Sequence, residues 1–410
     1  MPSTAPSSPP PLSVTSFPIP DRWCVHGYYS LCPYAPDGSD RILLAGADLE
    51  TGAGEIIILG PDRGIEHRFA TGPVGEAFWH TGFWQTWGPD CRHVYFQGGS
   101  LERPLIRRRE LATGRGVEAA GDMEGSPPFG EPISSGLLGM LYAAGYGDGV
   151  YRPERAPVPF QDRDRHGIFE HTLDPASSRL RFSVAELLER HPQRDRLLAA
   201  DQEIKSRLGK NDGLTLMAYC VRWNRAGTRC LFYFGNHCVV KSRGEPRIGM
   251  VYTADRDFRE IHLVLDLSFG RRGVHWSWQP DGEHLIGYGP HPDDPTHACL
   301  AEVRYDGTGY RMLSEHASGG HPSVSPLDPD LIVTDEGTPT GGAVLFLSRR
   351  TGREVARVSL PKFIGESEPP GRNPHRICHH PVFNHRGDRV LCNTLPGRHA
   401  VLAEIVPPAL

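Results

Sequence analysis

Short apolar runs follow Gly- or Asp-containing turns at regular intervals along the chain. The turn Pro36-Asp37-Gly38 precedes the run Ile42–Ala45, and the turn Pro280-Asp281-Gly282 precedes His284–Gly287. Further copies of this turn lie at 89–91, 225–227, 327–329 and 385–387. The copies are about 50 residues apart, except across one gap between 91 and 225, and such a period is typical of repeat architectures.

A second turn signal, Thr-Gly, occurs inside the same units, at 51–52, 113–114 and 351–352. Strand, Gly turn, strand, Thr-Gly turn and strand make a four-stranded antiparallel meander. The gap between 91 and 225 holds a degenerate copy at Ser135–Tyr142 and an insertion, so the count is seven. The pattern therefore predicts an all-β, seven-bladed β-propeller. Two unrelated β domains are the alternative, but they do not explain why one turn recurs on both sides of the gap.

The same pattern gives the expected domain boundaries. One propeller covers residues 13–410, after a Pro- and Ser-rich tail at 1–12 that we expect to be disordered. The segment Ser13–Phe17 is predicted to close the ring by pairing with Val401–Ile405 in the last blade. Leucines at helical spacing predict a short helical insertion at about 183–208, after the third blade.

The composition of the chain argues against nucleic-acid and membrane partners and favours a reducing compartment. The net charge of -5 provides no basic footprint for nucleic acid, and no run of 18 apolar residues predicts a membrane span. The nine cysteines include no Cys-x-x-Cys pair, so we expect no disulfide framework. The N-terminus lacks the pattern of a signal peptide. We therefore expect a cytoplasmic monomer or dimer.

Four successive repeats carry a potential metal ligand seven residues before the turn residue Gly227, Gly282, Asp328 or Gly387. These ligands are Cys220, His275, His321 and His380. Innermost strands line the channel of a propeller, and alternation along the strand places His275 in the channel and Trp276 between blades. One Cys and three His suit zinc, with manganese or calcium as other possibilities. In the alternative interpretation, these side chains only hydrogen-bond neighbouring blades.

Three phrases of the chain resemble those of the seven-bladed propeller polysaccharide lyases, the oligogalacturonate and ulvan lyases. They are His26–Ser30 with the following turn, Gly320–Ser325 with Ile332–Asp335, and His380–Phe383. The resemblance covers residues 24–405 thinly, and it implies a divalent metal at the three histidines named above. Cys220 stands where oligogalacturonate lyases place a functional His, which favours the zinc-containing, ulvan-lyase-like branch.

The resemblance also implies β-elimination next to a uronic acid in an acidic oligosaccharide. This reaction needs a cation to neutralise the uronate carboxylate, a base for the C5 proton and an acid for the departing oxygen. The order of functional residues in ulvan lyases implies His80 and Tyr146 as the acid–base pair and Arg163 as the neutralising group. We further expect contacts to the substrate from Arg165, Arg152, Trp84 and Tyr219. For each of these arginines, a solvated loop is the alternative.

Two other classes of function remain open at this point. The first is a non-catalytic propeller that binds or scaffolds, in which the histidines are structural. The second is a propeller glycoside hydrolase that uses the same pocket without elimination.

Overall fold

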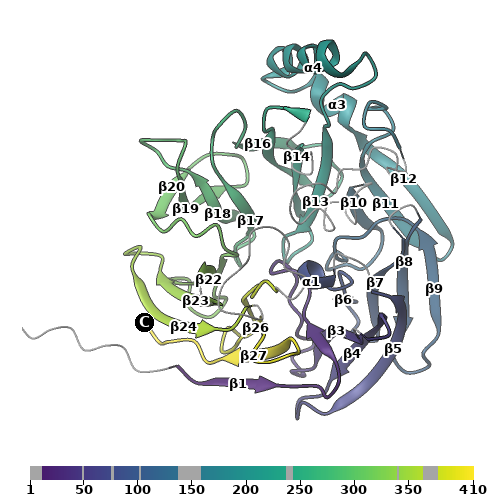
Figure 1. Ribbon diagram of the computed structural model, residues 1–410, viewed down its shortest axis with the longest axis vertical. Coiled ribbons are helices and arrows are strands. Elements are labelled where there is room, and N and C mark those ends of the chain that lie inside the picture. Colours follow the sequence, from purple (N-terminus) through teal and green to yellow (C-terminus); the bar gives the residue numbers. More distant parts are fainter. Residues whose placement is uncertain are drawn as a thin grey trace, which may run out of the picture.

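The computed structural model describes residues 12–48, 50–74, 78–100, 103–136, 158–236, 243–338, 341–362 and 377–410. Within these residues, seven antiparallel sheets are arranged radially around one axis (Figure 1). The predicted all-β, seven-bladed propeller is therefore confirmed. Six of the sheets have four described strands and one has three.

The first three blades precede the helical insertion. Blade one contains β2 (Trp23–Val25), β3 (Ile42–Asp48), β4 (Ala53–Leu59) and β5 (Ile65–Pro73). Blade two contains β6 (Thr86–Trp87), β7 (His93–Gly99), β8 (Pro104–Glu110) and β9 (Gly116–Ala120). Blade three is described by β10 (Ile133–Gly136), β11 (Gly167–Leu173) and β12 (Ala176–Ser183).

The other four blades follow the insertion. Blade four contains β13 (Met217–Trp223), β14 (Arg229–Gly235), β15 (Gly249–Asp255) and β16 (Ile261–Asp266). Blade five contains β17 (Val274–Trp278), β18 (His284–Pro290), β19 (Ala298–Arg304) and β20 (Arg311–Ser314). Blade six contains β21 (Ser323–Val324), β22 (Leu331–Thr338), β23 (Gly341–Ser348) and β24 (Glu354–Leu360). Blade seven contains β25 (Val382–Phe383), β26 (Val390–Thr394), β27 (Val401–Ile405) and β1 (Val14–Phe17).

The recurring turn works through a left-handed residue. Gly38, Gly282 and Gly387 have φ values of 75°, 71° and 79°. Glycine adopts this conformation without the clash of a Cβ, so the chain reverses tightly between the first and second strands of a blade. In blade two, Cys91 takes the same position with φ of 53°. The repeat read from the sequence is thus a repeat of backbone conformation.

Strand β1 closes the ring as predicted. It pairs antiparallel with β27, with Val14 opposite Ile405 and Phe17 opposite Leu402. The N-terminal segment therefore completes a blade whose other strands come from the C-terminus. This pairing joins the two ends of the repeat array.

The predicted helical insertion consists of α3 (Val184–Glu189) and α4 (Arg194–Leu208). Ser183 caps α3 through a reciprocal pair of hydrogen bonds with Glu186, which satisfies two backbone N–H groups at the start of the helix. Leu187 and Leu197 are buried in a cluster that includes residues of blades three and four. Among the described residues, no helix is long and apolar enough to cross a membrane.

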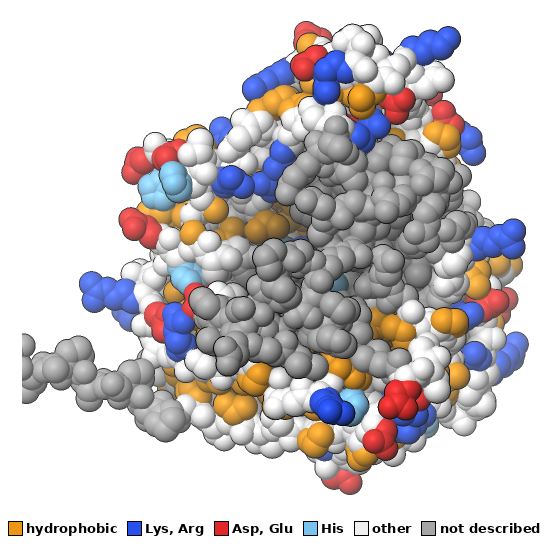
Figure 2. Space-filling view, in the orientation of Figure 1, with side chains coloured by type: hydrophobic (Ala, Val, Ile, Leu, Met, Phe, Trp, Pro, Cys, Tyr) orange, Lys and Arg blue, Asp and Glu red, His pale blue; other side chains and the backbone are white. Residues whose placement is uncertain are grey.

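Packing between blades agrees with the predicted alternation in β17. Trp276 has no exposed surface and lies in a core cluster that joins blades four and five. On the surface, basic and acidic side chains are mixed around the rim of the face in Figure 2.

Blade three contains a buried histidine that makes stability depend on pH. Burial lowers the pKa of His171 to about 4, so the imidazole is neutral in the folded protein at neutral pH. The unfolded chain binds a proton below about pH 6.5. This contribution to stability is therefore complete above pH 6.5 and is lost as the pH falls towards 4, by about 3 kcal/mol.

We expect His171→Gln to reduce the difference between the free energies of unfolding at about pH 7 and about pH 4.5. Denaturant titrations of both proteins at the two pH values measure this difference. An unchanged pH dependence in the variant would contradict the interpretation.

Candidate functional site

The predicted register is marked by an unusual backbone conformation. Trp84, Cys220, His275 and His380 have φ values of 53°, 55°, 59° and 46°. Non-glycine residues adopt this region rarely and at a cost in free energy, so its recurrence at one position in four blades has to be held by the surroundings. At Cys220 and His275, strand pairing is interrupted directly after the preceding residue. Pairing resumes two residues later, at Arg222 and at Ser277.

Imidazole rings from different blades gather at this level of the axis. The ring centroids of His275 and His321 are 4.2 Å apart, and those of His321 and His380 are also 4.2 Å apart. His80 joins them, with its ring centroid 5.2 Å from that of His380. His80 and His275 are half-buried, whereas His321 and His380 are buried. Solvent therefore reaches the cluster at His80 and His275.

In His275 and His321, hydrogen bonds determine which ring nitrogen is protonated and which has a free lone pair. Nδ1 of His275 lies 2.9 Å from the carbonyl oxygens of Gly319 and Gly320, to which only a protonated nitrogen donates. Nδ1 of His321 lies 2.9 Å from Oδ1 of Asp335. In both rings Nε2 is then unprotonated and can accept a proton or bind a metal. Histidines that bind metals commonly donate their other ring N–H to a carbonyl or carboxylate in the same way.

Burial keeps two of these imidazoles, His275 and His380, neutral. Burial, followed by the neighbouring His321, lowers the pKa of His275 and of His380 well below the ordinary value. Burial alone would raise the pKa of Asp335, but contact with His321 holds that pKa below its usual range. Neutral imidazole is the form that binds a metal or accepts a proton.

Several nitrogens of the cluster have unused hydrogen-bonding capacity. Nε2 of His321 and both ring nitrogens of His380 are buried without a hydrogen-bond partner. Buried polar atoms are normally satisfied, and each exception requires an explanation such as a ligand or ion. These residues therefore fit a metal ion.

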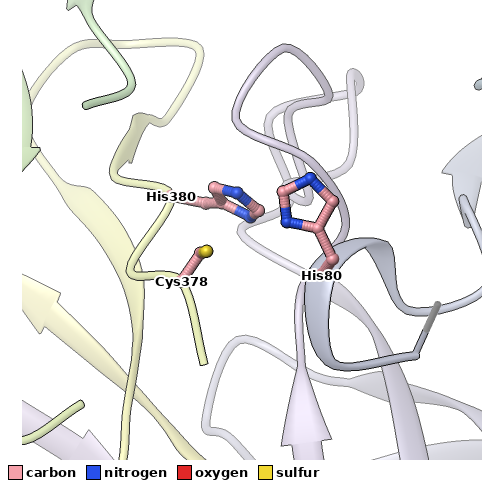
Figure 3. A group of neighbouring side chains, drawn as sticks. All are labelled: His80, Cys378 and His380. Carbon is pink, nitrogen blue, oxygen red and sulfur yellow. The ribbon is translucent and has the colours of Figure 1, made fainter. Parts of the chain in front are cut away.

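One set of ligand atoms is compact enough to surround an ion. A nitrogen of His80, Sγ of Cys378 and a nitrogen of His380 all lie within 4.8 Å of one another, the only such set of three or more His, Cys, Asp or Glu ligands in the described ranges. Figure 3 shows the three side chains converging from α1 (Phe78–Thr81) and from the segment that precedes β25. Thiolate and imidazole ligands suit zinc.

The predicted set of four metal ligands is therefore only partly assembled. His380 belongs to the compact set, but Cys220, His275 and His321 do not. Tyr28, from a loop of blade one, packs edge-on against these rings. Its ring centroid lies 4.9 Å from that of His380 and 5.9 Å from that of His321.

In blade one, the residues that follow the inner strand β2 contribute aromatic side chains to the site. Tyr28 and Tyr29 form a buried cluster with Trp84, against which Leu31 packs. Trp84 was predicted to contact substrate, and it lies in this cluster.

A buried guanidinium faces the same aromatic cluster. Arg222 is 7% exposed, and its Cζ lies 5.0 Å from the Tyr28 ring and 5.2 Å from the Tyr29 ring. Its Nη1 donates to Oη of Tyr29 at 2.9 Å and to the carbonyl of Trp276. It forms no ion pair with any residue that the structure describes. A buried cation without an ion pair is costly, and contacts with the tyrosine rings and the charge interaction with the buried Glu124 offset this cost only in part. An anionic ligand would offset it further.

Arg222 and His275 share a small hollow that reaches towards the surface. The hollow, of about 20 Å³, is also lined by Tyr219, Tyr233 and Arg247. Arg247 is exposed, and its Nη2 donates to the carbonyl of Gly273 at 2.7 Å. Tyr219, which was predicted to contact substrate, therefore lines the same hollow as His275, Arg222 and Arg247.

Other predicted site residues lie elsewhere. Nη2 of Arg163 lies 2.6 Å from Oδ1 of Asp201 in α4, and Arg165, which is largely exposed, pairs with Asp162 at 3.2 Å. His80 was expected at the start of an inner strand, but it lies in the short helix α1, which ends at the left-handed Gly82 (φ 60°). Tyr146 and Arg152 lie outside the described residues. No disulfide bond joins any two of the eight described cysteines.

Sequence reasoning did not assign Cys378, Tyr28, Tyr29 or Arg222 to the site. A signal for the tyrosines was present in the phrase His26–Ser30, which interrupts the blade-one repeat. Arg222 lies two residues after Cys220, and strict alternation would have placed it on the same face.

The comparisons with known proteins agree with this fold. No protein-family model and no curated protein matches the chain. Among solved structures, an oligogalacturonate lyase in complex with manganese is similar, with a TM-score of 0.59, 13% identity and 98% of each chain covered. An oligogalacturonate lyase from Vibrio parahaemolyticus is similar with a TM-score of 0.60, 13% identity and coverage of 98% of this chain and 99% of that one.

A TolB structure from Acinetobacter baumannii also matches, with a TM-score of 0.39, 13% identity and coverage of 77% of this chain and 62% of that one. At 13% identity, the similarity to the two oligogalacturonate lyases shows the propeller fold alone.

Proposed function

We propose that this chain is a metal-dependent lyase that cleaves uronate-containing oligosaccharides by β-elimination at the propeller axis. The observation that carries the proposal is a group of imidazoles with unused nitrogens near the buried guanidinium of Arg222, which forms no ion pair with a described residue. The similarity in fold to two oligogalacturonate lyases supports the choice of reaction class.

We assign the metal to His80, Cys378 and His380, with His321 adjacent to His380. Zinc is the ion that this donor set favours, although one of the similar lyases holds manganese. When bound, the ion supplies positive charge that stabilises the enolate-like transition state. A nitrogen of His80 belongs to the compact ligand set. We therefore assign proton abstraction to another imidazole and not to His80.

His275 is the proposed base. It is half-buried, its Nδ1 is held by two carbonyl oxygens, and its Nε2 is therefore free to accept a proton. In the reaction, Nε2 takes the C5 proton of the uronate. The electrons of that C–H bond form the C4–C5 double bond, and the bond from C4 to the glycosidic oxygen breaks.

Arg222 is the proposed partner of the substrate carboxylate, in place of Arg163. It shares the hollow with His275, so a carboxylate on the guanidinium would bring the neighbouring C5 proton towards the base. Neutralising that carboxylate makes the C5 proton more acidic. Tyr146 keeps its assignment as the acid that protonates the departing oxygen, on the basis of the sequence alone.

An ultraviolet assay tests the proposal. The zinc-loaded protein is incubated with a panel of oligogalacturonate and ulvan oligosaccharides, and we expect absorbance from an unsaturated uronate to rise together with new reducing ends. New reducing ends without that chromophore would indicate a hydrolase. Neither signal with any member of the panel would indicate a binding propeller.

A further inference from the structure

A second hollow lies away from the axis, at the helical insertion. It has a volume of about 370 Å³, within the range of small-molecule sites, and it is lined by Pro159, Gln161, Asp162, Arg163, Lys205, Lys210 and Asn211. None of these residues belongs to the imidazole cluster. Helix α4, which carries Lys205, lies at the outer edge of the propeller, whereas α1 with His80 lies near its centre (Figure 1).

A buried carboxylate holds two of the cations in this hollow. Asp201 is 2% exposed and accepts hydrogen bonds from Nη2 of Arg163 at 2.6 Å and from the backbone N–H of Leu214 at 2.7 Å. Nζ of Lys205 lies 2.7 Å from its other oxygen. Asp201 holds both cationic side chains in place, so a ligand would bind them at little further cost in conformational entropy.

The lining is rich in hydrogen-bond donors and poor in acceptors. The lining carries three cations, Arg163, Lys205 and Lys210, and one carboxylate, Asp162. Together with the buried Asp201, which binds two of the cations, these five groups sum to one net positive charge. Nε of Arg163 is buried without a hydrogen-bond partner. The remaining polar lining consists of two amides, which donate as well as accept.

We propose that this hollow is a second, separate binding site for a small anion, either the carboxylate of a sugar acid or a phosphate group. The two oxygens of a carboxylate lie in a plane, and the oxygens of a phosphate are arranged as a tetrahedron. Both groups accept hydrogen bonds from guanidinium and ammonium donors. The site does not depend on cleavage at the axis, because it shares no residue with the proposed catalytic group.

Calorimetric titration with galacturonate and, separately, with inorganic phosphate tests the proposal. The variant is Lys210→Glu, because Lys210 is exposed and outside the Asp201 network, so the fold should survive. We expect Lys210→Glu to weaken binding of at least one of the two anions by about tenfold or more. The matched control is Arg350→Glu, which makes the same change of charge at a side chain that is 83% exposed in blade six. It should change affinity by less than about twofold.

The titrations are repeated in an Arg222→Met background, in which the axial site lacks its proposed carboxylate partner. Binding that survives Arg222→Met and weakens in Lys210→Glu supports the hollow, even if the protein cleaves no oligosaccharide. Loss of galacturonate binding points to a sugar acid, and loss of phosphate binding points to a phosphate ligand. Equal affinity in wild type and Lys210→Glu, or no saturable binding of either anion, would overturn the proposal.

Discussion

His380→Ala is expected to remove the bound metal ion and to lower kcat/KM by about 100-fold or more, since even outer-shell substitutions at metal sites cost 10–100-fold. His380 belongs to the compact ligand set and contacts the rings of both His80 and His321. Its two nitrogens have no other hydrogen-bond partner. Elemental analysis of purified protein should find about one equivalent of zinc per wild-type chain and almost none in the variant.

His379→Ala is the matched control. His379 is equally buried and adjacent, but its Nδ1 lies 2.8 Å from the carbonyl oxygen of Asn393 in the blade. The control should lower stability through lost packing while the metal content stays at the wild-type level. Metal retained in His380→Ala, or lost equally in both variants, would contradict the assignment of His380.

Arg222→Met is expected to lower kcat/KM by about 100- to 1,000-fold, the usual cost of removing one group that stabilises developing negative charge. At the same time we expect the free energy of unfolding to stay the same or to increase. The reason is that the variant removes a buried cation that forms no ion pair with a described residue, and its desolvation cost exceeds the worth of its hydrogen bonds to Tyr29 and Trp276. Initial rates and denaturant titrations of one preparation measure both quantities.

Arg349→Gln provides the control for Arg222→Met. Arg349 follows β23 in blade six and pairs with Glu302 of blade five at 2.7 Å. It lines neither the hollow of Arg222 nor the compact ligand set. This control should lose some stability and keep its turnover. Turnover near the wild-type rate in Arg222→Met would refute its role, and so would a loss of activity that merely follows unfolding.

The fold was predictable because its signals are local and repeated. A Gly turn before each apolar run reports a backbone conformation, and the structure has a left-handed residue at Gly38, Gly282 and Gly387. Ring closure by Ser13–Phe17 followed from the need to cover the last edge strand, and β1 meets that need. A short helical insertion was likewise visible in the spacing of its leucines.

The site was less predictable because it depends on contacts between distant segments. The register grouped Cys220, His275, His321 and His380, and three of these, but not His321, share a left-handed backbone. It gave no information about Tyr28, which packs against the rings from a loop of blade one, or about Cys378, which lies two residues before the register position. Arg163 follows the predicted spacing in the sequence, but spacing along a loop does not determine which cavity a side chain lines.

The mass of the cleavage products tests the central claim most directly. Wild-type protein loaded with zinc is incubated with purified uronate oligosaccharides of known length, and the products are analysed by mass spectrometry. β-Elimination predicts two fragments whose masses add up to that of the substrate, with a double bond in the fragment that carries the new non-reducing end. Fragments that together exceed the substrate by one water, or an intact substrate throughout the panel, would contradict the account.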